Sequence, residues 1–411
     1  MTDLPGASAE AERADTAPVP AWHETLPSAW LRIAAIGERD AVVAGEIEDE
    51  PLVLGGRSIV AEGPANLFVT RVDARGRHRW TKAFGGPGRE TIASIAAGDE
   101  ALVLAGASEG GVDFGGGALG AGAFLAKLDG SGQHLWSRAI AGAVVGRVRL
   151  DGEGNIVVLI GAKGPIDFGD GAITSPGGVI VAKLDARGRH VWSKTYGPEV
   201  AVNDIAVTRT GAVVVVGRLT GRYDFGGGVV ATSEGPGNSA AIIVAYKEDG
   251  SFWWNQRWGG FDNQEARRVV VDDDGNVFVH LKEGSGPVLG LYGYGASGQP
   301  RWNTGLGGMA VLAADHEGNV VYGTVSYTSG AASLGMFDAA GRLVWTRGLG
   351  SETKIHDLAV TPSGAILIAG RASGPTDLGG GVVLKPGAHD RGFVAALGLS
   401  SARAGRSVTA R

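Results

Sequence analysis

Short apolar runs alternate with glycine-containing polar turns along most of the chain. The segment VIVAKL at residues 179–184 is followed by the turn DARG and then by HVWSKTYG, in which polar and apolar residues alternate. Alternation with a period of two is typical of a β-strand with one buried face. The turn supplies an Asp, which can bond to its own backbone, and a Gly, which accepts a positive φ. The pattern therefore predicts a tight β-hairpin.

The second strand of this hairpin carries a recurring tryptophan. It begins the pattern W-x-x-x-Φ-G, where Φ is apolar, and the Gly is replaced only once, by Ala141. A second hairpin, such as DIAVTRTGAVVVVG or LAVTPSGAILIAG, precedes it, so each repeat has four strands, A to D, with Trp on strand D. Four-stranded repeats of this length predict a β-propeller, because one repeat cannot bury its own face. The pattern begins at Trp80, Trp136, Trp192, Trp254, Trp302 and Trp345.

Seven strand-A hairpins can be counted, but only six C–D hairpins are complete. The last repeat ends in a strand C, RGFVAALGLSS, whereas PVPAWHETLP at residues 18–27 fits the strand-D pattern through Trp22 and Leu26. We therefore predict an all-β fold, a seven-bladed β-propeller of four-stranded antiparallel blades. Its N-terminal strand completes the last blade and removes a free sheet edge.

The repeat boundaries predict a single domain at residues 18–400, between a flexible tail at 1–17 and a polar tail at 401–411. In this arrangement the short A–B and C–D turns share one face of the propeller. The longer, varied B–C and D–A loops share the other face, where function tends to be located. The closing strand is expected at 18–27, and the blades at 28–85, 86–141, 142–197, 198–259, 260–307, 308–350 and 351–400.

Composition excludes several classes of protein. The chain has 411 residues, a formal net charge of −6 and no Cys, which argues against nucleic-acid binding and excludes disulfides and Cys nucleophiles. No apolar run approaches the roughly 18–20 residues of a membrane helix, and the acidic, Ala/Pro-rich N-terminus does not resemble a signal peptide. We expect a monomer, cytoplasmic as read from this chain, with no membrane span, nucleic-acid partner, metal or cofactor.

The repeats FLAKLDGSGQHLWS and VIVAKLDARGRHVWSKTYG, with the segments VDFGGG and IDFGDG, resemble the bacterial seven-bladed β-propeller repeat family. The resemblance covers nearly the whole chain from about residue 28. It implies the propeller fold and a place among exported bacterial proteins, and it implies no particular activity.

Asp-Phe-Gly recurs at residues 113–115, 167–169 and 224–226, and TDLGGG stands at 376–381. In a protein kinase this Asp would hold magnesium, but here the motif repeats in several blades. We expect an apolar plug on the B–C loop, with the Asp capping backbone N–H groups. Similarly, His78, His134 and His190 precede a Trp by two residues, but Phe252 and Leu343 occupy the same position elsewhere. That position predicts packing and not a zinc site.

One position near the start of strand A is more informative. It belongs to the innermost strand, so its side chains should surround the mouth of the axial channel. Charges of opposite sign alternate between neighbouring blades, which favours a belt of ion pairs, with a site for a polar ligand as the alternative. We call these the inner-ring residues: Arg32, Ser94, Arg147, Asp204, Arg268, Val311 and Asp357.

Two functions remain open. The first is a non-catalytic binding or scaffolding propeller that holds a protein or a small polar ligand at the loop-rich face. Its candidate ligand-binding residues are Arg32, Arg147, Arg268, Asp204 and Asp262. A lectin-like variant would need repeated exposed aromatic residues, and Trp30, Trp253 and Trp258 do not repeat in this way.

The second function is a lyase or hydrolase with its site at the same channel mouth. His356 could act as a general base beside Asp357. Adjacent residues in a regular strand point to opposite sides, which weakens this pair. The candidate catalytic residues are His356, Asp357, Asp204 and Glu352, with Glu90, Asp262 and Glu265 on the same face.

Overall fold

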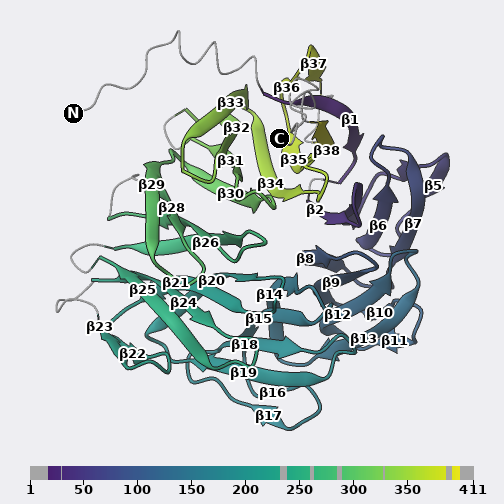
Figure 1. Ribbon diagram of the computed structural model, residues 1–411. Coiled ribbons are helices and arrows are strands. Elements are labelled where there is room, and N and C mark those ends of the chain that lie inside the picture. Colours follow the sequence, from purple (N-terminus) through teal and green to yellow (C-terminus); the bar gives the residue numbers. More distant parts are fainter. Residues whose placement is uncertain are drawn as a thin grey trace, which may run out of the picture.

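The protein forms seven four-stranded antiparallel sheets arranged around an axis. The sheets follow one another in sequence order, so the colours run once around the ring in Figure 1. The innermost strand of each sheet contacts that of the next, including the last with the first. This confirms the predicted seven-bladed propeller. The computed structural model describes residues 17–28, 30–231, 238–259, 263–284, 289–326, 329–385 and 391–398.

Strands A to D of each blade run from the axis outwards. Blade 1 contains β2 (Leu31–Ile36), β3 (Asp40–Ile47), β6 (Asn66–Val72) and β7 (His78–Phe84). Blade 2 contains β8 (Glu90–Ala97), β9 (Ala101–Ser108), β12 (Gly122–Asp129) and β13 (His134–Ile140). Blade 3 contains β14 (Ala143–Leu150), β15 (Ile156–Ala162), β18 (Val179–Leu184) and β19 (His190–Tyr196). Blade 4 contains β20 (Val200–Val207), β21 (Val213–Leu219), β24 (Ala240–Tyr246) and β25 (Phe252–Trp258).

The remaining blades follow the same plan. Blade 5 contains β26 (Glu265–Val271), β27 (Val277–Lys282), β28 (Leu289–Tyr294) and β29 (Pro300–Gly305). Blade 6 contains β30 (Met309–Ala314), β31 (Val320–Val325), β32 (Ala332–Phe337) and β33 (Leu343–Gly350). Blade 7 contains β34 (Thr353–Val360), β35 (Ile366–Ala372), β38 (Arg391–Gly398) and β1 (Val19–Leu26).

Five B–C connections fold into small two-stranded hairpins on the loop-rich face. Their strands are β4 (Leu52–Leu54) with β5 (Arg57–Ile59), β10 (Val112–Asp113) with β11 (Ala118–Leu119), β16 (Ile166–Asp167) with β17 (Ala172–Ile173), β22 (Arg222–Asp224) with β23 (Val229–Ala231), and β36 (Thr376–Gly379) with β37 (Val382–Leu384). Within the described residues, no helix is long and apolar enough to cross a membrane.

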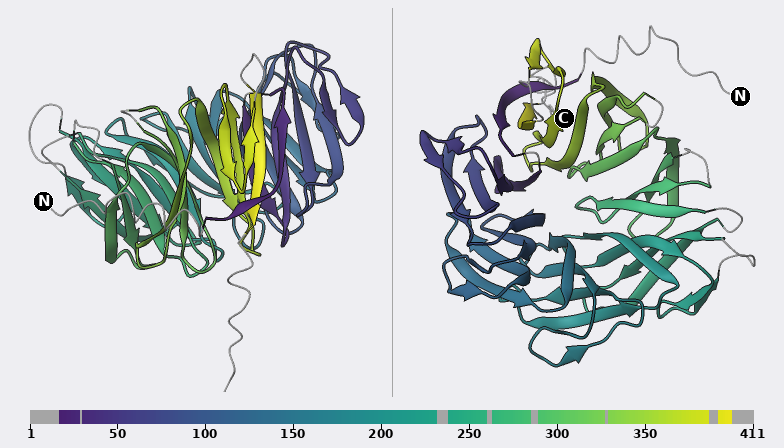
Figure 2. Two further views of the ribbon diagram at one scale, coloured as in Figure 1. Left: turned by 90° about the horizontal axis from the view of Figure 1, so that it is seen from above. Right: turned by 180° about the vertical axis from the view of Figure 1, so that it is seen from behind.

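The N-terminal strand β1 closes the ring. It pairs antiparallel with β38 from Val19 opposite Gly398 to Leu26 opposite Gly392, and the two strands run side by side in Figures 1 and 2. Pro18 directly precedes β1 in the chain, and its carbonyl oxygen accepts a hydrogen bond of 2.7 Å from the guanidinium group of Arg347 in blade 6. The prediction that PVPAWHETLP supplies the last outer strand is confirmed.

In five blades the recurring tryptophan forms a hydrogen bond to the next blade. The indole N–H of Trp192 in blade 3 donates to the carbonyl oxygen of Glu248, in the C–D turn of blade 4, at 2.9 Å. Gly250 of that turn has a φ of 81°, and a Cβ there would lie 2.9 Å from the Trp192 ring. Glycine is therefore required both for the turn and for the contact. Equivalent N–H bonds are formed by Trp80, Trp136, Trp254 and Trp302.

The Asp-Phe-Gly motifs have a structural role in the B–C hairpins. The carboxylate of Asp113 accepts the backbone N–H groups of Gly115 at 2.7 Å and Gly117 at 3.0 Å. Phe114, which follows Asp113, is buried in the core between blades 1 and 2. Asp carboxylates bind the glycine N–H groups in the same way at Asp167, Asp224 and Asp377.

The strand-D histidines pack beneath these hairpins. His134 lies under Gly116, where an added Cβ would come within 2.1 Å of its ring, and Phe252 lies under Gly227 in the same way, at 2.2 Å. The His134 Nε2 also lies 3.0 Å from the hydroxyl of Ser137 on the same strand. A position that holds His or Phe against a glycine is a packing position.

Candidate functional site

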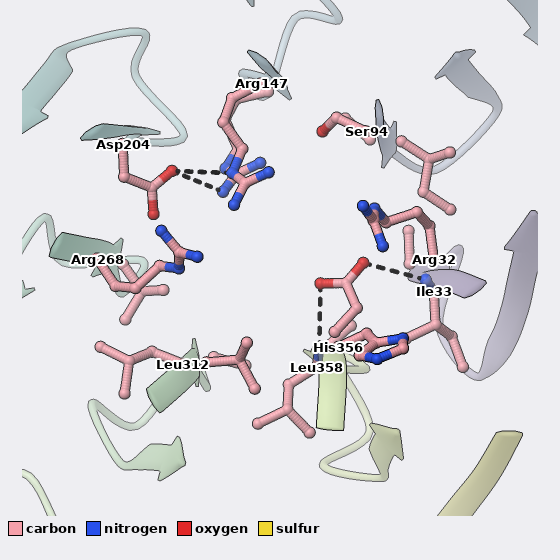
Figure 3. A pocket seen from close by; sticks show the side chains of 18 of the residues that line it. Arg32, Ile33, Ser94, Arg147, Asp204, Arg268, Leu312, His356 and Leu358 are labelled. Carbon is pink, nitrogen blue, oxygen red and sulfur yellow. Dashed lines mark hydrogen bonds and ion pairs between the residues drawn. The ribbon is translucent and has the colours of Figure 1, made fainter. Parts of the chain in front are cut away.

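The seven A strands surround a cavity of about 770 Å³ on the propeller axis (Figure 3). All seven inner-ring residues line it. Two residues further along each A strand, the lining side chains are mostly small, which leaves the axis open. They are Ala34, Ala96, Arg149, Ala206, Val270, Ala313 and Ala359.

A β-bulge directly precedes the inner-ring residue in five blades. In blade 7, the pairing of β34 with β35 shifts register between Ile355 and Asp357, so His356 is the extra residue. A bulge breaks the regular alternation of the strand and re-aims the side chains beside it. The extra residues in blades 2 to 5 are Ala93, Gly146, Asn203 and Arg267.

Inner-ring acceptors bind the backbone of the following blade. The Asp357 carboxylate accepts the N–H of Ile33 at 3.2 Å, and the Asp204 carboxylate accepts the N–H of Val269 at 3.3 Å. The hydroxyl of Ser94 makes the equivalent bond to blade 3 at 3.2 Å. Each bound N–H lies one residue after the inner-ring residue of its own strand. These side chains therefore hold neighbouring A strands in register.

Asp204 also forms a small ion-pair cluster. Its Oδ1 lies 3.3 Å from the Nε of Arg147 and 3.5 Å from an Nη of Arg149. The Asp204 side chain is only 3% exposed, whereas those of Arg147 and Arg149 are 27% and 32% exposed. The carboxylate is thus held inside the wall, while both guanidinium groups reach into the cavity.

The other ion pairs of the expected belt are not formed. Within the described chain, Asp204 has no ion pair with Arg268, and Asp357 has none with Arg32. The second oxygen of Asp204 and both oxygens of Asp357 instead accept backbone N–H groups. The belt hypothesis is therefore corrected to a single cluster at Asp204.

The cavity has an excess of positive charge, although the whole chain is acidic. The partners of the Arg32 and Arg268 guanidinium groups among the described residues are backbone carbonyl oxygens, at 2.9–3.1 Å. Burial lowers the pKa of both arginines, because their charge is withdrawn from water. The cavity lining contains two carboxylates, those of Asp204 and Asp357, and six cationic side chains. The cationic residues are Arg32, Arg147, Arg149, Arg268, Lys354 and Arg371.

His356 lines the cavity, but it does not form a catalytic dyad with Asp357. As the bulge residue it escapes the alternation expected of a regular strand, and its ring stacks on Trp30 with centroids 4.9 Å apart. Among the described residues, its Nδ1 has no hydrogen-bond partner. Burial, and secondarily nearby cations such as Arg32, lower the pKa of His356 to about 4, so the ring is neutral at pH 7 and a weak base.

The other candidate carboxylates lie away from the cavity lining. Glu90 is buried and accepts a hydrogen bond from the hydroxyl of Ser108 at 2.9 Å. Glu265 pairs with Arg267 at 3.1 Å, and Glu352 is exposed on the turn before β34. None of these three side chains lines the described cavity, and Asp262 lies outside the described residues.

Sequence reasoning missed several lining residues. Arg149 could have been found from the sequence, because the other six blades hold Ala or Val at the equivalent position and a charged residue stands out there. Lys354 and Arg371 are opposite each other across β34 and β35, and no pattern along one strand identifies such a pair. Trp30 does not recur in the other blades, so the repeat pattern gives it no position in the cavity.

A buried histidine lies behind one inner-ring arginine. His280 on β27 is paired in register with Arg268 on β26, and it is 1% exposed. Burial lowers its pKa to about 4. In six sister blades the residue opposite the inner-ring residue is Ala, Leu, Val or Gly.

We expect His280 to make the fold less stable as the pH falls from about 6.5 to 4. Its folded pKa lies below the ordinary value of 6.5, so the unfolded chain binds more protons in this window, at a cost of up to about 3 kcal/mol. Urea unfolding at pH 7 and pH 4.5 should show a smaller acid loss in His280→Val than in the parent. An equal acid loss in both proteins would contradict this assignment.

Comparison with known proteins supports the fold. No family model and no curated protein matches the chain. Among solved structures, puromycin hydrolase matches with a TM-score of 0.50 and 14% identity, over 92% of this chain and 56% of that one. The propeller domain of the Trilobed protease from Pyrococcus furiosus gives a TM-score of 0.49 and 11% identity, over 87% and 97%. BamB from Moraxella catarrhalis gives 0.39 and 11%, over 85% and 98%.

The chain thus spans about half the length of puromycin hydrolase. At such low identity the similarity reports a shared propeller architecture. It does not transfer an activity or a set of site residues.

Proposed function

We propose that this propeller reversibly binds a small anionic ligand in its axial cavity, without a chemical step. The supporting observation is the charge of the lining, where six cationic side chains face two carboxylates whose oxygens are already bonded. Guanidinium groups suit carboxylates and phosphates, because two parallel N–H groups can bind two oxygens. An anion would also compensate the partly buried cations Arg32 and Arg268.

A lyase or hydrolase at the same cavity is the second candidate. It is favoured by His356, which is neutral and has an unpartnered Nδ1 in the described structure. It is weakened by Asp357, whose oxygens bind backbone N–H groups and do not orient the imidazole. Loss of a turnover in His356→Ala, with anion binding retained, would favour the enzyme.

We also propose that the ligand enters from the loop-rich face, that the protein is a monomer and that its partner is not a nucleic acid. The blade boundaries expected from the sequence belong to the same proposal. Membership of the bacterial seven-bladed repeat family belongs to the same proposal. The fold alone does not choose between binding and catalysis.

Anion binding should be visible as thermal stabilisation. At constant ionic strength, increasing inorganic phosphate is expected to raise the melting temperature of the parent, because a ligand of the folded state stabilises it. Arg268→Gln should lose most of this rise, since its guanidinium group faces the cavity without an ion pair among the described residues. Arg342→Gln, a side chain 81% exposed and paired with Asp338, is the matched control. Equal rises in all three proteins would contradict the proposal.

Asp204→Asn is expected to lower stability and to strengthen anion binding. The buried carboxylate neutralises Arg147 and Arg149, and its loss should cost about 1–3 kcal/mol, between the values for solvated and buried pairs. The same change frees two guanidinium groups for a ligand. Urea unfolding and phosphate titration of this variant measure both effects. Reduced stability with unchanged phosphate affinity would instead assign Asp204 a purely structural role.

A further inference from the structure

Two A strands differ from the other five. Over the described residues, β2 and β30 pair with their neighbours without a register shift. Trp30 directly precedes β2 and lies two residues before Arg32. Met309 begins β30, and because residues two apart in a regular strand share one side, it points the same way as Val311. Both side chains, those of Trp30 and Met309, line the cavity, and they are 52% and 57% exposed.

Blade 6 forms an apolar part of the cavity wall. All residues that blade 6 contributes to the cavity lining are apolar, among them Met309, Leu312 and Val325. In a ring of seven, blade 6 lies opposite blades 2 and 3, and blade 3 supplies Arg147 and Arg149. Figure 3 shows Leu312 across the cavity from Arg147.

On blade 1, beyond the polar side chains that blade 7 contributes, Trp30 adds a second apolar surface to the cavity, and contacts hold its ring in position. His356 stacks on it, with the ring planes 18° apart, and the guanidinium carbon of Arg371 lies 5.7 Å from its centroid. An indole held in this way and still half exposed offers a preformed apolar surface at the mouth. Binding to a preformed surface loses less side-chain freedom than binding to a mobile one.

We infer that the ligand is an amphipathic anion, with a phosphate or carboxylate at one end and an apolar group of about the size of a phenyl ring at the other. This inference rests on the proposed function. The charged end lies among Arg147, Arg149 and Arg268, and the apolar end lies against Met309 and Trp30. A compact oxyanion would satisfy the arginines but leave the apolar wall in water, whereas an amphipathic anion buries it.

Calorimetric titration of the full chain with inorganic phosphate and with phenyl phosphate tests the inference. Both titrations are done at one pH and one ionic strength. Phenyl phosphate is expected to bind on the order of tenfold more tightly, as burial of an aromatic ring predicts. Trp30→Ala should lose most of this advantage, measured as the ratio of its affinities for the two anions. Trp253→Ala, which removes an exposed indole of blade 4 outside the cavity lining, should keep it.

The outcomes separate this inference from the proposed function. If both anions bind with equal affinity, the amphipathic ligand is excluded and anion binding stands. The inference is also wrong if the advantage of phenyl phosphate survives in Trp30→Ala and in Met309→Ala. If neither anion binds, the proposed function fails, and the inference fails with it.

Discussion

Deletion of residues 1–27 is expected to abolish the stable monomer, or to lower its melting temperature by about 10 °C or more. The deletion removes β1, whose backbone covers the whole outer edge of β38. It also removes Leu26, which is buried in the cluster between blades 7 and 1. An uncovered strand edge is a template for aggregation. Differential scanning calorimetry and light scattering of the purified variant measure both consequences.

A shorter deletion, of residues 1–16, is the matched control. It keeps β1 and also the carbonyl groups of Ala17 and Pro18 that Arg347 binds. We expect it to melt close to the parent. A monomeric variant lacking 1–27 with the melting temperature of the parent would show that β1 does not close the ring.

Trp192→Ala is expected to cost about 3–5 kcal/mol of unfolding free energy, as for other buried aromatic side chains. The indole is 9% exposed. Its removal leaves a cavity between blades 3 and 4 and deprives the Glu248 carbonyl of its N–H donor. The positive φ of Gly250 holds that turn in place, so the turn cannot easily collapse onto the gap. Urea unfolding monitored by circular dichroism gives the difference.

Two controls show whether the cost comes from the contact between blades. Trp253→Ala removes an indole on strand D of blade 4 that is 38% exposed, and should cost far less. His190→Leu should also cost little, since Leu343 occupies the equivalent position in blade 6. Equal losses in Trp192→Ala and Trp253→Ala would contradict the role assigned to the recurring tryptophan.

Most of the fold could be predicted from the sequence, because one contact is repeated between most neighbouring blades. The Trp ring on strand D packs against the Gly of the next C–D turn, so both residues recur in the sequence. Their spacing therefore gives the length of the repeat directly. The missing strand of blade 7 and its replacement at Trp22 follow from counting these residues. Gly76 in the C–D turn of blade 1 lies against Trp22, as Gly250 lies against Trp192.

The site could be predicted only in part. The inner-ring position follows from the repeat, because it keeps a constant place relative to the turns. The direction of the side chains beside it cannot be predicted in this way, since the bulge at His356 and the regular pairing of β2 arise from contacts between strands. The bonding of Asp357 to a backbone N–H of the next blade, in place of Arg32, could not be foreseen for the same reason.

The central claim is that the inner-ring arginines form an anion site on the propeller axis. The most direct measurement is anomalous diffraction from crystals soaked in sodium selenate, because selenium locates the anion without any assumption about its place. The account predicts an anomalous peak inside the cavity, within hydrogen-bond distance of the guanidinium groups of Arg147 and Arg268. Peaks at exposed arginines such as Arg342, with none inside the cavity, would contradict it.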